Sequence, residues 1–246
     1  MPPLLEVASL TRRFGGTLAL DGASFAVPAP GIVGLIGPNG AGKTTLFDII
    51  CGRQTADSGT VRFEGTRIDG LAPHRLSRLG FARSFQECRI LPEATCLDNL
   101  LFASQEKRLW RELAGIVAPP RQNRDHARAL LATAGLERFA DVAAGELSFG
   151  QRRLVEILST LMAAPRVLLL DEPASGVNPT LLATLHDVLS EAVPRLGLLL
   201  LLIEHNMAFV MSLAERVVVM HQGAVLADGT PEEVQQDARV IDAYLG

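Results

Sequence analysis

The amino-acid sequence predicts an α/β fold with a mostly parallel sheet and an inserted helical segment. Short apolar runs, each followed by glycine or by acidic residues, occupy 32–36, 167–170 and 198–203. Such runs are typical of strands that are buried on both faces of a parallel sheet. Segments with helical spacing lie between them, which implies right-handed crossover connections. The stretch 92–146 carries helical patterns and no strong strand pattern, so we expect a helical subdomain inserted into the α/β domain.

The N-terminal part of the chain begins with residues 4–10, which are compatible with a β-strand. A turn at Gly15 and Gly16 leads to a second strand candidate around 23–27, and a segment rich in proline and glycine ends that strand. After the first apolar run and the glycine-rich stretch that follows it, residues 43–50 predict a helix.

The helical segment contains three patterns with helical spacing, at 97–102, 105–116 and 125–134, and two consecutive prolines break the chain after the second. Between the second and third apolar runs, residues 179–193 also predict a helix. Asn178 is placed to act as its N-cap, and a proline occupies its first position.

Composition excludes several classes of protein. The 246 residues are 48% hydrophobic and 20% charged, which excludes an intrinsically disordered chain and a disulfide-stapled scaffold. The formal net charge of −4 argues against a protein that grips nucleic acid through a broad basic face. The longest apolar run, 196–203, is too short to span a bilayer. Three cysteines without a Cys-x-x-Cys spacing, and an N-terminus without a secretory signal, predict a cytoplasmic protein.

A glycine-rich motif joins the first apolar run to the helix predicted after it. Residues 37–45 read GPNGAGKTT and match the pattern G-x-x-x-x-G-K-[ST] in the strand–loop–helix context that this pattern requires. The glycines let backbone N–H groups wrap phosphates, Lys43 can neutralise the β- and γ-phosphates, and the Thr44 hydroxyl can bind Mg²⁺. The alternative is an ordinary glycine-rich turn with a solvated lysine. We predict a phosphate-binding loop made of Gly37, Pro38, Asn39, Gly40, Ala41, Gly42, Lys43, Thr44 and Thr45.

Two acidic residues, Asp171 and Glu172, close the strand predicted at 167–170. Ligands of parallel α/β sheets bind at this carboxyl edge of the strands. Asp171 suits the Mg²⁺ shell and Glu172 suits the polarisation of an attacking water, since phosphoryl transfer depends on positioning and charge compensation. The alternative is a solvated acidic turn that Pro173 caps.

Residues 147–151 read LSFGQ and precede a predicted helix, which Ser148 could cap. With these motifs the chain resembles, over essentially its whole length, the nucleotide-binding subunits of ATP-binding cassette (ABC) transporters. In that family an LSGGQ-like element clamps ATP that is bound to the partner subunit. Ser148, Gly150 and Gln151 match this element, whereas Phe149 stands where the family has glycine.

Further elements of the family follow along the chain. Phe14 aligns with the aromatic residue that stacks on adenine, and Gln86 aligns with the glutamine of a switch loop. Residues 175–178 match the loop that crosses the dimer interface, although Asn178 replaces the commoner aspartate. His205 matches the switch histidine that contacts the γ-phosphate. The catalytic residues that we expect are Lys43, Gln86, Glu172 and His205, and the expected Mg²⁺ ligands are Thr44, Gln86 and Asp171.

The resemblance also implies an architecture and a set of partners. Residues 1–246 would form one nucleotide-binding domain with the ABC ATPase fold. A P-loop NTPase core with a mostly parallel sheet and an antiparallel β subdomain would occupy 1–86 and 147–246, and a helical subdomain 87–146. The expected partners are transmembrane permease subunits and a second ABC ATPase subunit, either a paralogue or another copy. A periplasmic or extracellular substrate-binding protein would act indirectly, and no nucleic acid is expected. The chain would be peripheral on the inner face of the cell membrane.

Four segments indicate which group within the ABC family the chain resembles. Residues 80–86, 176–179, 203–207 and 240–246 are similar to ATPases of importers of branched-chain and related hydrophobic amino acids. Two related systems stay open as alternatives, the urea and short-chain amide importers and the lipopolysaccharide exporter. A soluble ABC ATPase of nucleic-acid repair, translation or iron–sulfur assembly is a further alternative. The single cassette, the absence of a sustained heptad pattern and the acidic composition disfavour it.

The segment 87–95 opens the helical insert and contains Ile90 and Leu91. In the family, a short cytoplasmic helix of the permease docks in the cleft between core and insert, so these apolar residues could form its socket. Alternatively, they pack the insert against the core. The sequence leaves both interpretations open.

Overall fold

The computed structural model describes residues 2–84, 90–105 and 121–245. Its contacts divide the chain into two compact units. The first unit comprises the described residues of Met1–Arg83, Arg166–Glu172 and Leu196–Gly246. The second unit comprises those of Ser84–Pro165 and Pro173–Arg195.

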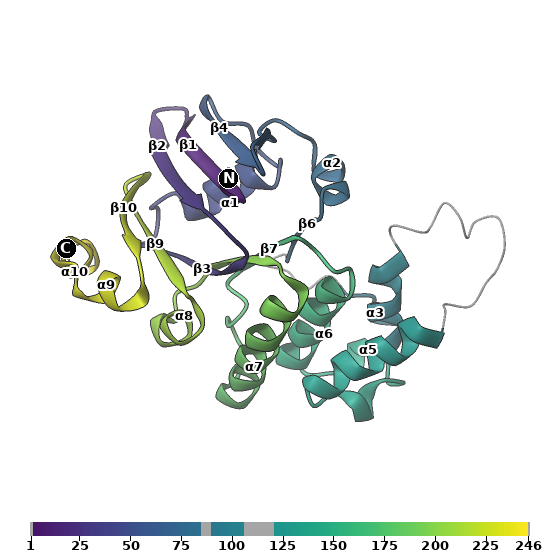
Figure 1. Cartoon of the computed structure of the whole chain (residues 1–246). Coiled ribbons are helices and arrows are strands. Elements are labelled where there is room, and N and C mark those ends of the chain that lie inside the picture. Colours follow the sequence, from purple (N-terminus) through teal and green to yellow (C-terminus); the bar gives the residue numbers. More distant parts are fainter. Residues whose placement is uncertain (1, 85–89, 106–120, 246) are drawn as a thin grey trace. The chain divides into compact units, whose positions relative to one another are not determined.

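The described part of the first unit contains two sheets (Figure 1). Its strands are β1 (Leu5–Phe14), β2 (Thr17–Val27), β3 (Gly31–Ile36), β4 (Ser58–Phe63), β5 (Thr66–Arg67), β6 (Phe81–Arg83), β7 (Val167–Asp171), β8 (Leu199–Ile203), β9 (Arg216–His221) and β10 (Ala224–Gly229). One sheet has the order β2-β1-β4-β5 and is antiparallel. The other has the order β10-β9-β3-β8-β7-β6, and only the pairing of β10 with β9 is antiparallel. The expected combination of a mostly parallel sheet and an antiparallel β subdomain is confirmed.

Helices occur in both units. Those of the first unit are α1 (Lys43–Ile50), α2 (Pro73–Arg78), α8 (Met207–Leu213), α9 (Pro231–Gln236) and α10 (Ala238–Leu245). The described helices of the second unit are α3 (Cys96–Gln105), α5 (Arg121–Thr133), α6 (Phe149–Met162) and α7 (Pro179–Leu196), whose last residue is grouped with the first unit, with the 3₁₀ turns η1 (Glu137–Phe139) and η2 (Ala144–Glu146). Within the described residues, a search for a helix with the length and apolar character of a membrane span found none.

The central strands form where the apolar runs predict them. Every residue of β7 and β8 is buried, as expected for parallel strands that are covered on both faces. The N-terminal strands are longer than predicted, because β1 and β2 form a hairpin whose ladder continues to the turn. In that turn Phe14 pairs with Thr17, and Gly15 takes up a left-handed backbone conformation (φ 55°) that glycine adopts without strain.

The core of the first unit surrounds α1. Leu46, Phe47 and Ile50 of this helix are almost fully buried, and they belong to one cluster with apolar side chains of both sheets, among them Val7 of β1 and Val33 of β3. This burial fixes α1, and with it the loop that connects β3 to α1.

The second unit is a bundle of helices in which α3 contacts α5 and α6. Leu100, Leu131 and Leu158 are buried within this unit. It is larger than the predicted insert 87–146, because α6 and α7 group with α3 and α5 rather than with the sheets. The helical pattern predicted at 105–116 falls, after its first residue, outside the described part of the chain.

Candidate functional site

The loop 37–42 between β3 and α1 depends on glycine at specific positions. Gly37 and Gly42 have positive φ angles of 146° and 98°. A Cβ atom at Gly37 would lie 2.1 Å from the carbonyl oxygen of Met220, and one at Gly42 would lie 2.4 Å from that of Ala19. Any side chain at either position would therefore collide with backbone that cannot give way. The loop packs so closely against β9 and β2 that only glycine fits at these two positions.

The N-terminus of α1 is open to an anion. Its N-cap is Gly42, which offers no side-chain hydrogen bond to the helix. Because the first N–H groups of a helix have no acceptor within the helix, they point outward from the first turn and carry the positive end of the helix dipole. Thr44 in this turn is exposed. Together with the curled loop, this end of α1 has the features of a phosphate-binding site, and we call it the cradle.

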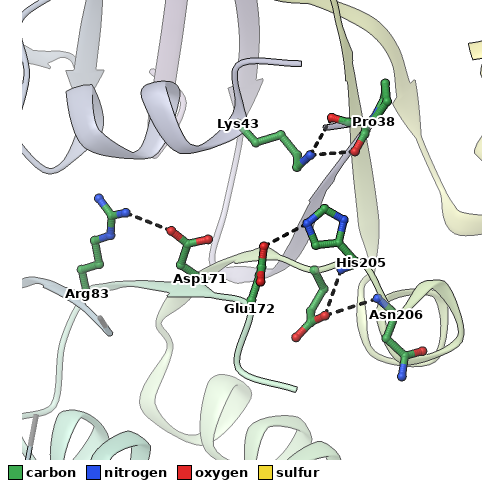
Figure 2. A network of polar contacts seen from close by, with 9 residues as sticks. Pro38, Lys43, Arg83, Asp171, Glu172, His205 and Asn206 are labelled. Carbon is green, nitrogen blue, oxygen red and sulfur yellow. Dashed lines mark hydrogen bonds and ion pairs between the residues drawn. The ribbon is translucent and has the colours of Figure 1, made fainter. Parts of the chain in front are cut away.

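Lys43 is held inside the cradle. Its Nζ donates to the carbonyl oxygens of Gly37 (2.6 Å) and Pro38 (2.9 Å), and the residue is buried (Figure 2). Burial lowers the pKa of Lys43, although the negative charges of Glu172 and Asp171 act in the opposite direction. The ammonium group thus rests on neutral carbonyl groups of its own loop, which an anionic ligand can replace as the stronger partner.

Asp171 ends β7 and is almost fully buried, with 1% of its surface exposed. Its Oδ2 accepts a hydrogen bond from Nη2 of Arg83 at 3.0 Å (Figure 2). Burial raises the pKa of Asp171, and the guanidinium of Arg83 opposes this effect. A buried carboxylate at the carboxyl edge of a parallel sheet, close to Lys43, is suited to a cation that accompanies a phosphate ligand.

Glu172 and His205 form the second polar contact of this edge. Nε2 of His205 donates to Oε1 of Glu172 at 2.9 Å (Figure 2). Glu172 has a φ angle of 48°, which is unusual for a residue with a side chain and costs of the order of 1 kcal/mol or more. Its backbone N–H donates to the carbonyl oxygen of Ile203, so β8 holds it in this conformation. The strained backbone turns the carboxylate toward His205.

Glu204 fixes the backbone of His205, a role that the sequence analysis did not assign. Its buried Oε2 accepts from the backbone N–H groups of His205 (2.9 Å) and Asn206 (3.3 Å). The side chain of Asn206 in turn caps α8 by accepting from the N–H of Phe209. The turn after β8 is therefore braced on both sides of the histidine.

Phe14 lies at the end of β1 and is 41% exposed. The guanidinium carbon of Arg12 lies 4.9 Å from the centre of its ring, and Arg12 is held by an ion pair with Asp57 at 2.7 Å. The ring is thus a supported, accessible aromatic surface that can stack on a planar ligand.

Ser148, Gly150 and Gln151 lie in the second unit, at the start of α6. Ser148 caps this helix in a capping box with Gln151, so the structural role that the sequence suggested is present. Phe149 is 47% exposed. Its ring lies next to Gly176, where an added Cβ atom would come within 3.1 Å of the ring. Gly176 therefore leaves the space that the aromatic ring at the third position of LSFGQ occupies.

Gln86, the remaining predicted site residue, lies outside the described residues. Among the described residues, no group of three or more His, Cys, Asp or Glu side chains could hold a metal ion by itself. Proteins commonly bind Mg²⁺ through one or two side chains and the phosphates of a substrate. Thr44 and Asp171 supply oxygen donors of the type that Mg²⁺ prefers.

Comparison with known protein families identifies the chain. A family model described as "ABC transporter" matches residues 20–175, more than half of the chain. The chain belongs to the ABC transporter family. A second model, described as "Branched-chain amino acid ATP-binding cassette transporter", matches residues 224–246 of this ABC protein. The family inferred from the sequence motifs is confirmed.

Two curated relatives of this ABC protein have similar length. It is 42% identical over 250 residues to the high-affinity branched-chain amino acid transport ATP-binding protein BraF of Pseudomonas aeruginosa, covering 99% of this chain and 98% of that protein. It is 37% identical over 250 residues to the corresponding protein LivG of Escherichia coli (strain K12), with the same coverage.

A solved structure confirms the fold of the ABC ATPase. The ADP conformation of MJ1267, an ATP-binding cassette of an ABC transporter, matches with a TM-score of 0.82 and 34% sequence identity, covering 100% of both chains. The α/β architecture of the family therefore extends over this whole chain.

Proposed function

We propose that this chain is the ATP-binding and ATP-hydrolysing subunit of an importer of branched-chain or related hydrophobic amino acids. The observation that carries the proposal is the convergence of Lys43, Asp171, Glu172 and His205 at one edge of the parallel sheet, with Nε2 of His205 2.9 Å from Oε1 of Glu172. The full-length similarity to BraF and LivG supports the class of transported molecule.

The nucleotide would lie along the open end of α1. In this proposal Phe14 stacks on the adenine, and the loop amides bind the phosphates. The residues that surround the phosphates are Gly37, Pro38, Asn39, Gly40, Ala41, Gly42, Lys43, Thr44 and Thr45. A Mg²⁺ ion held by Thr44, Asp171 and Gln86 would neutralise charge on the β- and γ-phosphates. Lys43 exchanges its loop carbonyls for phosphate oxygens, which keeps its charge in the cradle.

Hydrolysis requires a water molecule aligned with the γ-phosphate and a group that polarises it. We assign this task to Glu172; the assignment is supported by its strained backbone and its hydrogen bond to His205, which hold the carboxylate at the sheet edge. His205 then serves two purposes in the proposal, since it orients Glu172 and offers a ring nitrogen to the γ-phosphate. Glu204 keeps His205 in place through the backbone.

The proposal includes the partners of an import system. A second ABC ATPase subunit, a paralogue or another copy, would bind ATP that is clamped by Ser148, Gly150 and Gln151 of this chain. ATP hydrolysis would be coupled to transport through transmembrane permease subunits. A periplasmic or extracellular substrate-binding protein would deliver the amino acid to the permease. The chain would then lie at the inner face of the membrane. The names of the relatives, transport ATP-binding proteins, support this arrangement.

Reconstitution tests the proposed function. The chain should be co-expressed with candidate permease and ATPase subunits from the same genome, purified in detergent and inserted into vesicles with a candidate substrate-binding protein. We expect ATP-dependent uptake of labelled leucine that exceeds uptake of urea. Uptake of urea without uptake of leucine would show that the transported molecule is urea and not an amino acid. A chain that hydrolyses ATP but never co-purifies with a permease would contradict the transport role.

Leu91 is a candidate contact for the permease. It is 48% exposed, and the loop that carries it is anchored by Asn99, which is buried. Oδ1 of Asn99 accepts from the N–H of Leu91 (2.7 Å), while Nδ2 donates to the carbonyl oxygens of Leu91 (3.0 Å) and Thr95 (2.9 Å). The exposure of Leu91 in its own unit favours docking over core packing.

Leu91→Asp should abolish permease-stimulated hydrolysis while changing the free energy of unfolding by no more than about 0.5 kcal/mol, as for other surface substitutions. Asn99→Ala is the matched contrast, because it leaves the backbone of the loop without its partners and should cost about 1–3 kcal/mol of stability. Thermal unfolding of the isolated subunit and ATPase assays with and without permease measure the two effects. A destabilised Leu91→Asp variant would identify Leu91 as a core residue instead.

A further inference from the structure

Arg83 connects two parts of the candidate site that are far apart in the sequence. Its Nη1 donates to Oδ1 of Asp48, and its Nη2 donates to Oδ2 of Asp171 at 3.0 Å. Asp48 lies in α1, the helix that begins at Lys43, whereas Asp171 ends β7. One planar guanidinium therefore joins the phosphate-loop helix to the carboxylate proposed to face the metal.

The surroundings of Arg83 leave it little freedom. Its side chain is 10% exposed. The guanidinium carbon lies 5.8 Å from the centre of the Phe47 ring. Phe47 and Asp48 are neighbours in α1, so Arg83 contacts the end of β7 and two positions of α1 at once. Its place in the parallel sheet is fixed by the pairing of β6 with β7, in which Arg83 lies opposite Leu169.

Without a cation between them, the carboxylates of Asp48 and Asp171 would repel each other in a poorly solvated place. An arginine can hold both, because its fork presents several donors in one plane, whereas a lysine is a point charge on a flexible stem. The pair would also be more weakly oriented with lysine. A bridge of this geometry sets the position of the Asp171 carboxylate relative to Lys43 and Thr44.

We propose that Arg83 is a positioning residue that aligns Asp171 with the phosphate-loop helix and thereby tunes the affinity of the site for Mg²⁺-bound nucleotide. The inference rests on the proposed function, in which Asp171 is one of the metal ligands, with Thr44 and Gln86. Arg83 itself does not touch the nucleotide. Groups that hydrogen-bond to metal-binding carboxylates typically contribute about 10- to 100-fold to metal affinity or activity.

Equilibrium binding of trinitrophenyl-ATP, measured by its fluorescence in EDTA and again in Mg²⁺, tests this role without relying on hydrolysis. In Arg83→Met we expect the dissociation constant in Mg²⁺ to rise about tenfold or more, whereas the constant in EDTA stays at the wild-type value. Arg83→Lys should restore part of the Mg²⁺-dependent affinity. Asp48→Asn should weaken it in the same selective way, because the bridge to α1 loses its ionic partner.

Arg216→Met is the control, since it removes another arginine–aspartate pair, with Asp228, on β9 and β10 of the same unit. It should change neither constant. Equal weakening of Arg83→Met in EDTA and Mg²⁺, with a lowered thermal midpoint, would make Arg83 a structural residue only and overturn the inference. Unchanged binding would also overturn it. If Arg83→Met does not fold, Arg83→Lys and Asp48→Asn decide by the same criterion. A wild-type chain that binds no nucleotide in either buffer would instead contradict the proposed function.

Discussion

Glu172→Gln should bind ATP as the wild type does and hydrolyse it about 10²- to 10⁴-fold more slowly, the range for loss of a general base. The amide keeps the size of the carboxylate, and its oxygen can still accept from Nε2 of His205, so the geometry of the contact survives. It cannot polarise an attacking water as a carboxylate does. Single-turnover hydrolysis and nucleotide binding, measured on the same preparation, separate the two effects.

Glu64→Gln is a matched control for this variant. Glu64 also has a left-handed backbone, with a φ angle of 50°, and it pairs with Arg166 on the surface of the same unit. The control should hydrolyse ATP normally.

In the assembled ATPase pair, Glu172→Gln should also elute as a stable dimer in ATP and Mg²⁺ during size exclusion. A wild-type single-turnover rate in Glu172→Gln would remove this residue from the catalytic role.

Lys43→Ala should weaken nucleotide binding and lower hydrolysis by about 10²- to 10³-fold, because the developing phosphate charge loses a preorganised cation. The fold should tolerate the change. Lys43 contributes two bonds to neutral carbonyls, and its burial already disfavours the charged form, as its lowered pKa shows. Calorimetric titration with ATP and thermal unfolding together distinguish a lost ligand contact from a lost fold.

Lys107→Ala, at the other lysine of the sequence, provides the comparison for a general loss of positive charge. It lies outside the phosphate-loop motif and should leave ATP affinity unchanged. Mg²⁺–ATP binding of undiminished affinity in Lys43→Ala, with normal turnover, would show that the loop 37–45 does not hold the phosphates.

Elements whose signal is local could be predicted from the sequence. The apolar runs that become β3, β7 and β8 are continuous, and the helix after the phosphate loop has the same bounds in sequence and structure. The strand β6 carries no such signal, because its three residues, Phe81–Arg83, show no periodicity and end in a charged side chain. It is a strand because β7 pairs with it, and that pairing is invisible in one segment of sequence.

Some residues of the candidate site also have a local signal in the sequence, whereas others do not. Lys43, Asp171 and Glu172 stand in short motifs that follow strands, so the sequence locates them. The role of Arg83 depends on partners 35 and 88 residues away. The role of Glu204 depends on a turn that brings the backbone N–H groups of the next two residues back to its carboxylate. Such contacts are properties of the folded chain, and no pattern in the sequence predicts them.

The order of strands in the parallel sheet also governs how the protein is made. The strand that carries the phosphate loop, β3, has β8 and β9 as its neighbours, and the ribosome delivers both of them late. Until then, its apolar residues and unpaired backbone groups are exposed on the nascent chain, where they invite aggregation. The proposed nucleotide site is complete only when residues 199–221 arrive, because Gly37 packs against Met220 and Glu172 contacts His205. Nucleotide is therefore not expected to assist the first steps of folding. A chain interrupted before β8 is expected to need chaperone protection and to gain no stability from ATP.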